Sequence, residues 1–128
     1  MPIFKINNKL ILFTHIPKCG GTSVEKYFLE IGCKIAFYDN KIYQISEESR
    51  WNKSSPQHID GESFGRLFSD DFFDHKFLIC RHPYSRLKSA FGYHKFVEKT
   101  IDADQPLDDF VGNNLSNAAS GIGKYDHH

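Results

Sequence analysis

The chain has 128 residues, of which 40% are hydrophobic and 12 are phenylalanine, which is enough for one domain with a real core. Its 16 basic and 16 acidic side chains give a formal net charge of zero. This balance argues against a general nucleic-acid-binding surface, which needs an excess of positive charge, but it allows one small anionic ligand held by a local cluster of donors.

The cysteine pattern favours a reducing compartment, and the hydropathy favours a soluble chain. Cys19, Cys33 and Cys80 are odd in number and widely spaced, which indicates neither a disulfide framework nor a zinc site. Cys33 and Cys80 are expected to be small buried hydrophobes. The longest apolar run, residues 10–13, is too short to cross a bilayer. Residues 1–8 lack the basic start and following apolar stretch that are typical of a signal peptide, so none is expected. We therefore expect a soluble, cytoplasmic protein without a transmembrane segment.

A strand followed by a helix opens the predicted pattern. Residues 10–14 are a continuous apolar run without helical periodicity, as in a strand buried on both faces. Apolar side chains at spacings of three and four then predict a helix over residues 22–31 that stops at Gly32. Thr22 or Ser23 is the expected cap of this helix. Its expected apolar stripe consists of Val24, Tyr27, Phe28 and Ile31.

The middle of the chain predicts shorter elements. Residues 35–38 and 42–45 flank a polar turn and are interpreted as a hairpin or two short strands. Residues 47–57 are polar and indicate a surface loop. Apolar side chains along one face predict a helix over residues 60–73, and residues 77–80 read as a second buried strand.

A second strand and helix pair follows. Pro83 suits the first turn of a helix whose apolar stripe extends to Val97. Residues 106–111 predict a short helix, and residues 112–128 are expected to be a loop. The alternation of strands and helices predicts an α/β sandwich with a mostly parallel sheet, in which ligands bind at the carboxyl ends of strands.

The segment between the first strand and the first helix has the composition of an anion site. Gly20 and Gly21 let the backbone turn tightly and approach a ligand. The N–H groups of a helix start attract phosphate or sulfate, and Lys18 and the hydroxyls of Thr22 and Ser23 add donors. The plainer alternative is a glycine-rich turn capped by Thr22, and turn chemistry alone leaves both interpretations open.

The order of the residues in this segment disfavours an ATPase or a nucleotide kinase. The usual phosphate loop, GxxxxGK[ST], places its lysine after the glycines. Here Lys18 precedes Gly20 and Gly21. No clear apolar strand ends in an aspartate that would hold magnesium.

A second segment that could bind an anion begins at the end of the second predicted strand. Arg81 stands at that end and can make a charge-assisted contact to a phosphate. Ser89 lies further along the following helix, on the face that carries Arg86. The alternative is an amphipathic helix on which Arg86 and Lys88 are simply solvated.

These two segments resemble one family. Residues 14–24 closely resemble the 5′-phosphosulfate loop of sulfotransferases that use 3′-phosphoadenosine 5′-phosphosulfate (PAPS), and residues 78–91 resemble the 3′-phosphate site of that family. There an arginine and a serine eight positions later hold the 3′-phosphate, which maps onto Arg81 and Ser89. The resemblance covers residues 11–97 and is strongest to the carbohydrate-directed branch with its soluble bacterial relatives.

The resemblance implies a fold, a chemistry and a set of site residues. The fold would be a P-loop-like three-layer sandwich with a central mostly parallel sheet flanked by helices. The reaction would move a sulfuryl group from PAPS to a hydroxyl, with a carbohydrate as acceptor class and without a metal. Lys18 and His58 would be catalytic, His58 as general base. The implied nucleotide-binding residues are Lys18, Cys19, Gly20, Gly21, Thr22, Ser23, Arg81 and Ser89. His15 is expected behind the loop, and His94 is expected to be packed.

The extent of the domain leaves alternatives open. We expect one sulfotransferase-like domain over residues 1–128, with a nucleotide-binding core at residues 9–99 and a weakly structured or incomplete part at residues 100–128. The family's domain usually continues further, so residues 125–128 could begin its closing segment, or reflect truncation or a purification tag that supplies His127 and His128. A nucleotide-binding module without turnover and an atypical P-loop kinase are the alternative functions. The acceptor's identity and the oligomeric state are not predicted.

Overall fold

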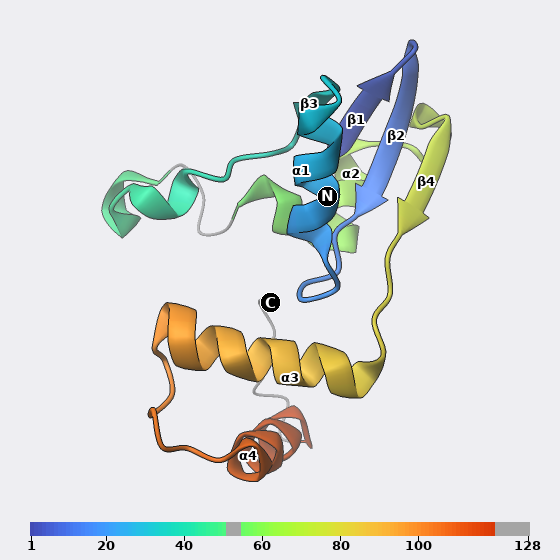
Figure 1. Cartoon of the computed structure of the whole chain (residues 1–128). Helices are drawn as coiled ribbons and strands as arrows, with labels where there is room; N and C mark the ends of the chain where they lie inside the picture. Colours follow the sequence, from blue (N-terminus) through green and yellow to red (C-terminus); the bar gives the residue numbers. More distant parts are fainter. Residues whose placement is uncertain (51–54, 120–128) are drawn as a thin grey trace. The chain divides into compact units, whose positions relative to one another are not determined.

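A computed structural model describes residues 1–50 and 55–119 of the chain (Figure 1). The contacts divide the chain into two units, Met1–Cys80 and Arg81–His128, and each unit is described by itself.

The first unit contains a four-stranded sheet in the order β3-β1-β2-β4 (Figure 1). Strand β1 (Ile3–Ile6) pairs antiparallel with both β2 (Lys9–Thr14) and β3 (Lys34–Ala36). Strands β2 and β4 (His75–Leu78) are parallel. Two of the three pairings in the described sheet are therefore antiparallel, and the prediction of a mostly parallel sheet is wrong.

A tight hairpin explains the antiparallel character of the sheet. Asn7 and Asn8 join β1 to β2 with φ angles of 47° and 62°. Two positive φ angles in a two-residue loop are typical of the turn that matches the twist of paired strands, and asparagine accepts this conformation more readily than most residues. Strand β1 was not among the predicted elements, and its pairing with β2 displaces the expected parallel arrangement.

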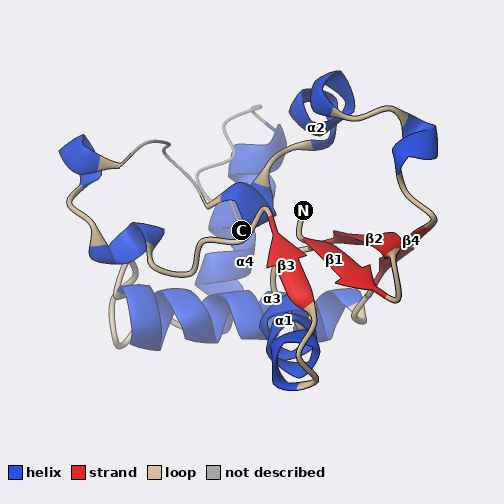
Figure 2. Ribbon diagram, turned by 90° about the horizontal axis from the view of Figure 1, so that it is seen from above, coloured by secondary structure: helices blue, strands red, loops and turns tan. Residues whose placement is uncertain are grey.

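Helices lie on both faces of this sheet (Figure 2). Helix α1 (Gly21–Glu30) covers one face, where the Phe28 ring stacks on Phe4 with a centroid distance of 4.2 Å. Helix α2 (Gly61–Leu67) covers the other face, where Phe64 packs in a cluster with Ile3, Leu12 and Phe73. The α/β class is confirmed. The P-loop-like three-layer sandwich stays a prediction.

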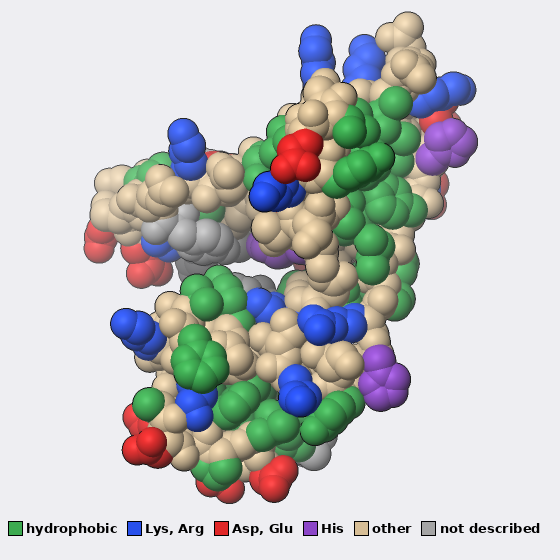
Figure 3. Space-filling model, viewed as in Figure 1, with side chains coloured by type: hydrophobic (Ala, Val, Ile, Leu, Met, Phe, Trp, Pro, Cys, Tyr) green, Lys and Arg blue, Asp and Glu red, His purple; other side chains and the backbone are tan. Residues whose placement is uncertain are grey.

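Strand β4 forms one edge of the described sheet, and its end is exposed. Phe77 is half-buried and stacks on Phe13 at 4.9 Å, but Leu78 is 52% exposed and Ile79 and Cys80 are exposed as well. Hydrophobic side chains accordingly appear on the surface of this unit (Figure 3). The strand also begins two residues earlier than predicted. The expectation of a strand buried on both faces at residues 77–80 is wrong.

The segment after β3 departs from the predicted hairpin. Phe37 has a φ angle of 54°, which turns the chain away from the sheet, and Ile42–Gln44 forms a 3-10 helix instead of a strand. Two further 3-10 helices, Glu47–Ser49 and Pro56–His58, lie in the predicted loop, of which residues 51–54 are outside the described residues.

Helix α2 is shorter than the helix predicted over residues 60–73. The carboxylate of Asp60 caps it by accepting a hydrogen bond from the N–H of Ser63 at 2.8 Å. The helix ends at Leu67, and a 3-10 helix, Asp70–Phe72, leads into β4. The hydrogen-bonding side chain of Ser69 and the two aspartates after it favour this break in helical structure.

The second unit is helical in its described part. Helix α3 (Pro83–Tyr93) begins at the predicted proline and continues into a π-helical turn, His94–Glu98. His94 is buried, as expected, and its ring lies 6.0 Å from that of Phe110 on helix α4 (Leu107–Ala119). Helix α4 is longer than the predicted one, so the loop prediction is wrong for residues 112–119. Residues 120–128, including the segment 125–128, lie outside the described residues.

Two further expectations concern the cysteines and the membrane. Cys19 is buried, but Cys33 is half-buried and Cys80 is exposed, so the expected burial of these two side chains is wrong. Across residues 1–50 and 55–119, no helix has the length and apolar character needed to span a membrane.

Candidate functional site

The loop between β2 and α1 contains two residues in the left-handed conformation. Lys18 has a φ angle of 62° and Gly20 one of 90°. Glycine adopts this region freely, whereas for lysine it costs about 1–2 kcal/mol. The turn is closed by the N–H of Cys19, which donates to the carbonyl of Ile16 at 3.3 Å. Strained non-glycine residues of this kind are enriched at ligand-binding sites.

The start of helix α1 is open. Gly20 is its N-cap residue, and within the described residues no side chain caps the helix. The first turn contains no acidic residue, and the side chains of Thr22 and Ser23 are exposed. The expectation that one of these two residues caps the helix is therefore wrong. An uncapped helix start with exposed hydroxyls and a positive dipole end suits an anion.

Cys19 and Gly20 differ in exposure: Cys19 is buried and Gly20 is exposed. The side chain of Cys19 is buried, so this residue can offer a ligand only its backbone. Gly20 is exposed, and a β-carbon there would meet no described atom within 4 Å. Glycine is required at position 20 for its φ angle, not for space.

Gly21 is required for space. A β-carbon at this position would lie 2.0 Å from Nε2 of His15, and a contact that short does not occur in proteins. His15 follows β2 directly and stacks on Phe13, with the ring centroids 5.6 Å apart. Its imidazole occupies the space that a side chain at residue 21, the first residue of α1, would need.

Glu25 is the site residue that the sequence analysis missed. It is 2% exposed, and its Oε1 lies 2.7 Å from Nδ1 of His15. Residues 21, 25 and 28 lie on the sheet-facing side of α1, while Tyr27 and Ile31 of the predicted stripe are 58% and 53% exposed. The spacing of Gly21, Glu25 and Phe28 at i, i+4 and i+7 was the available signal that these residues share one helix face. Using it would have meant placing a charged residue on the buried face.

The carboxylate of Glu25 also acts on two other groups. The pKa of Tyr38 is raised, first by burial of its phenol and then by the negative charge of Glu25. The pKa of the terminal amino group of Met1 is lowered to about 5 by burial, which the attraction of Glu25 opposes. Glu25 is thus a buried centre of negative charge behind the loop.

His58 lies next to His15 in the same unit. The ring centroids of the two residues are 4.7 Å apart, and the planes are tilted by 53°. His58 is half-buried with its Nδ1 atom inside the protein, so a substrate would have to reach Nε2. The predicted base and the predicted phosphosulfate loop are therefore brought together, through His15 and Gly21.

The backbone around His58 is held by several hydrogen bonds. The hydroxyl of Ser55 donates to the carbonyl of Asp39 at 2.9 Å, and the N–H of Asp39 donates to Oε1 of Gln57 at 3.1 Å. The amino group of Met1 donates to the carbonyl of Pro56 at 2.9 Å. These contacts fix a short 3-10 turn that would otherwise have little structure of its own.

Arg81 and Ser89 belong to the second unit. Arg81 is exposed and precedes α3 by two residues, and Ser89 is half-buried within that helix. The first turn of α3 contains no acidic residue. Lys18 and its loop belong to the first unit, so the two halves of the predicted site are described separately.

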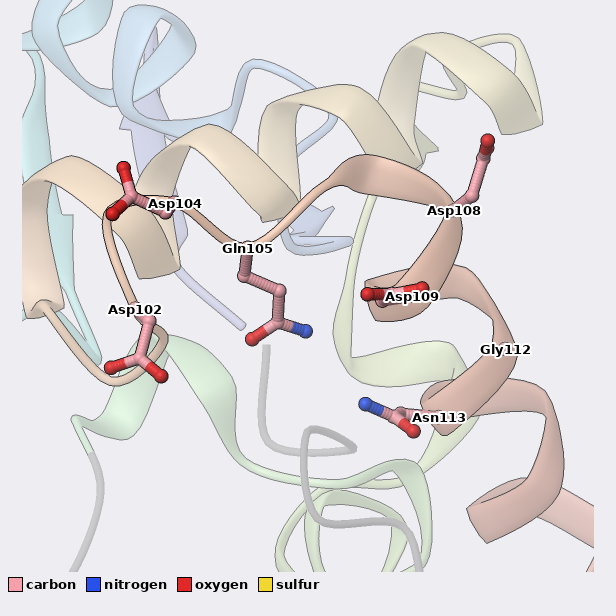
Figure 4. A pocket seen from close by; sticks show the side chains of 7 residues that line it. All are labelled: Asp102, Asp104, Gln105, Asp108, Asp109, Gly112 and Asn113. Atoms are coloured by element: carbon pink, nitrogen blue, oxygen red, sulfur yellow. The ribbon is translucent and has the colours of Figure 1, made fainter.

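A pocket of about 620 Å³ in the second unit has the wrong charge for a phosphate (Figure 4). It is lined by Asp102, Asp104, Gln105, Asp108, Asp109, Gly112 and Asn113. The carboxylates do not converge on one point. The described residues contain no group of three or more histidine, cysteine, aspartate or glutamate side chains arranged to hold a metal ion. None of the predicted site residues lines this pocket.

A family model matches most of the chain. A family model described as the sulfotransferase family matches residues 3–120, a range that includes both the loop at Lys18 and the segment from Arg81 to Ser89. Neither the curated proteins nor the solved structures contain a match to the chain.

Proposed function

The chain belongs to the sulfotransferase family, and we propose that it transfers a sulfuryl group from PAPS to a hydroxyl group of a carbohydrate. The observation that carries the proposal is the open N-terminus of α1, which follows a left-handed Lys18 and has no side-chain cap within the described residues. The choice of donor and acceptor rests on the resemblance of the two sequence segments, with the whole chain taken as one such domain.

The loop fits the sulfated end of the donor. The N–H groups at the start of α1 and the hydroxyls of Thr22 and Ser23 offer several donors to one anion. Lys18 supplies the mobile positive charge, and the exposed backbone at Gly20 permits close approach. Cys19 would take part through its backbone, because its side chain is buried.

A second phosphate requires a second set of donors. We assign the 3′-phosphate to Arg81, which can form a bidentate contact, and to the hydroxyl of Ser89. Arg81 precedes α3 by two residues and Ser89 lies within that helix, and no acidic side chain in the first turn of α3 competes for the arginine.

His58 would act as the general base. Its Nε2 would accept the proton of the acceptor hydroxyl as that oxygen forms a bond to sulfur and the bond between sulfur and the bridging oxygen breaks. The bridging oxygen leaves with the electron pair on the 5′-phosphate. Lys18 and the N–H groups of the loop would stabilise this charge, as preorganised donors do for other oxyanions. Lys18 would offset part of the negative charge at the 5′-phosphate and Arg81 part of that at the 3′-phosphate, and the proposed reaction uses no metal ion.

Calorimetric titration with adenosine 3′,5′-bisphosphate, and separately with ATP and magnesium, tests the nucleotide class. We expect binding of the bisphosphate and much weaker binding of ATP. Tight binding of ATP with magnesium and none of the bisphosphate would instead support an atypical P-loop kinase. Transfer of radioactive sulfate from PAPS to a panel of glycans then tests turnover, and bisphosphate binding without any transfer would identify a nucleotide-binding module.

A further inference from the structure

We propose that Glu25 is a positioning residue which, through His15, holds both the turn at Gly20 and Gly21 and the ring of His58 in place for sulfuryl transfer. The catalytic part of this inference rests on the proposed function. The structural part, the orientation of His15 by Glu25, does not.

The burial of Glu25 makes its partner indispensable. The side chains of Glu25 and His15 are 3% and 6% exposed, so water cannot satisfy the carboxylate if the imidazole turns away. A buried carboxylate without a hydrogen-bond donor is strongly unfavourable. The 2.7 Å contact between Oε1 and Nδ1 is therefore a strong restraint on the rotation of the imidazole ring.

The same contact determines which nitrogen of His15 carries the proton. A carboxylate in its ionised form only accepts hydrogen bonds, so the proposal assigns the donor role to Nδ1. The Nε2 edge then faces Gly21, where it occupies the volume of a β-carbon. Since Gly21 and Glu25 lie one turn apart on α1, the helix holds the ring at two points, at the first residue after the Gly20 turn and at the carboxylate.

The ring of His15 also packs beside the ring of His58. With centroids 4.7 Å apart, a rotation of His15 would change the space and the polarity beside the proposed base. Within the described residues, the titratable groups that interact with Glu25 include His15, Tyr38 and the amino group of Met1. Of these three groups, His15 is the one whose described contacts reach both Gly21 of the loop and His58.

Kinetics of two Glu25 variants test the catalytic part. Glu25→Leu removes the acceptor and the buried charge, whereas Glu25→Gln keeps an oxygen that can accept from Nδ1. We expect Glu25→Leu to lower kcat about tenfold or more, with the KM for PAPS changed less than about threefold, and Glu25→Gln to restore most of kcat. Glu30→Gln on the exposed face of α1 is the control and should leave kcat unchanged. Folded Glu25→Leu protein with the kcat of the original chain would overturn the inference.

Nuclear magnetic resonance tests the structural part without any turnover. Long-range proton–nitrogen spectra of the unsubstituted protein should show His15 protonated at Nδ1, and Glu25→Leu should abolish this preference and shift the amide signals of Gly20 and Gly21. His15 protonated at Nε2 alone in the unsubstituted protein would refute the proposal, even if Glu25→Leu does not fold. If the unsubstituted protein transfers no sulfate, the proposed function fails while this measurement still decides the role of Glu25.

Discussion

The Nε2 edge of His15 lies so close to Gly21 that a β-carbon at Gly21 would stand 2.0 Å from it. His15 follows strand β2 and Gly21 begins helix α1, so this contact brings the strand end and the helix start into close packing. The loop that we assign to the phosphosulfate group spans the gap. The conformation of the loop therefore depends on the contact between His15 and Gly21, and the side chain of His15 does not have to bind the ligand for this.

Gly21→Ala should destabilise the protein, because the added methyl group overlaps the buried imidazole of His15. Overpacking of this kind costs about 1–3 kcal/mol. Chemical denaturation measures the effect. Gly65→Ala is the matched control, since Gly65 lies within α2 and a β-carbon there would meet no described atom within 4 Å. Alanine at this position should stabilise by about 0.5–1 kcal/mol. Equal responses of the two variants would show that His15 moves away without cost.

Lys18→Gly should separate the stability of the loop from its chemistry. Glycine relieves the left-handed φ angle of 62°, so we expect stability to rise by up to about 1 kcal/mol. Loss of the cation should lower turnover about 10²- to 10³-fold. Lys99 has a φ angle of 55°, and Lys99→Gly should give a similar gain in stability with full turnover. A Lys18→Gly protein that keeps full turnover would remove this lysine from the mechanism.

His58→Ala should lower turnover about 10²- to 10⁴-fold, the range expected for loss of a general base. Calorimetry with adenosine 3′,5′-bisphosphate should show almost unchanged affinity, because the donor groups for the nucleotide lie elsewhere. His75→Ala on the exposed start of β4 serves as the control and should alter neither quantity. A large loss of bisphosphate affinity in His58→Ala would assign the residue to the binding of the nucleotide instead.

The sequence predicted the elements whose signals are local. Strand β2 and the helices α1 and α3 follow from an apolar run, from helical periodicity and from Pro83. Strand β1 was missed because four residues carry little pattern, and its place depends on the positive φ angles of Asn7 and Asn8. This hairpin made the sheet mostly antiparallel.

Of the candidate site residues, some were likewise predicted from local signals and one was missed. The loop residues and His58 were predicted from their segments and from family resemblance, and His58 does lie beside His15. Glu25 was not predicted, because a glutamate on a helix normally faces water. Its burial depends on a hydrogen bond from His15, which arrives from a different element. Periodicity within one helix cannot show such a partner.

The lowered pKa of Asp74 predicts that the stability of the folded protein decreases at low pH. Its carboxylate accepts hydrogen bonds from Nζ of Lys9 and from the N–H of Leu10, both at 2.8 Å, and the bond from Lys9 is the main reason that its pKa is lowered. A lowered pKa in the folded state means that the stabilisation is complete above the ordinary pKa of aspartate, about 3.9, and is lost as the pH falls through the lowered value. Asp74→Asn should therefore reduce the difference in melting temperature between pH 7 and about pH 3. Asp104→Asn, at an exposed position in the second unit, provides the comparison, and identical pH profiles for the two variants would contradict the role of Asp74.

Arg81→Ala should weaken the binding of one phosphate and leave the other intact. A hydrogen bond to a charged group contributes about 1.5–3 kcal/mol, so we expect the affinity for adenosine 3′,5′-bisphosphate to fall about 10- to 100-fold. The affinity for adenosine 5′-phosphate should stay the same, because this nucleotide lacks the 3′-phosphate. Ser89→Ala should follow the same pattern with a smaller loss.

Lys88→Ala is the control for both substitutions. Lys88 lies on the same helix with its Nζ 5.6 Å from the centre of the Tyr84 ring, and we assign it no contact with the nucleotide. Calorimetric titration of the three variants with both nucleotides gives a direct comparison. If Arg81→Ala lost affinity for both nucleotides equally, the arginine would act on the adenosine or on folding, and the 3′-phosphate would have to be bound by another group.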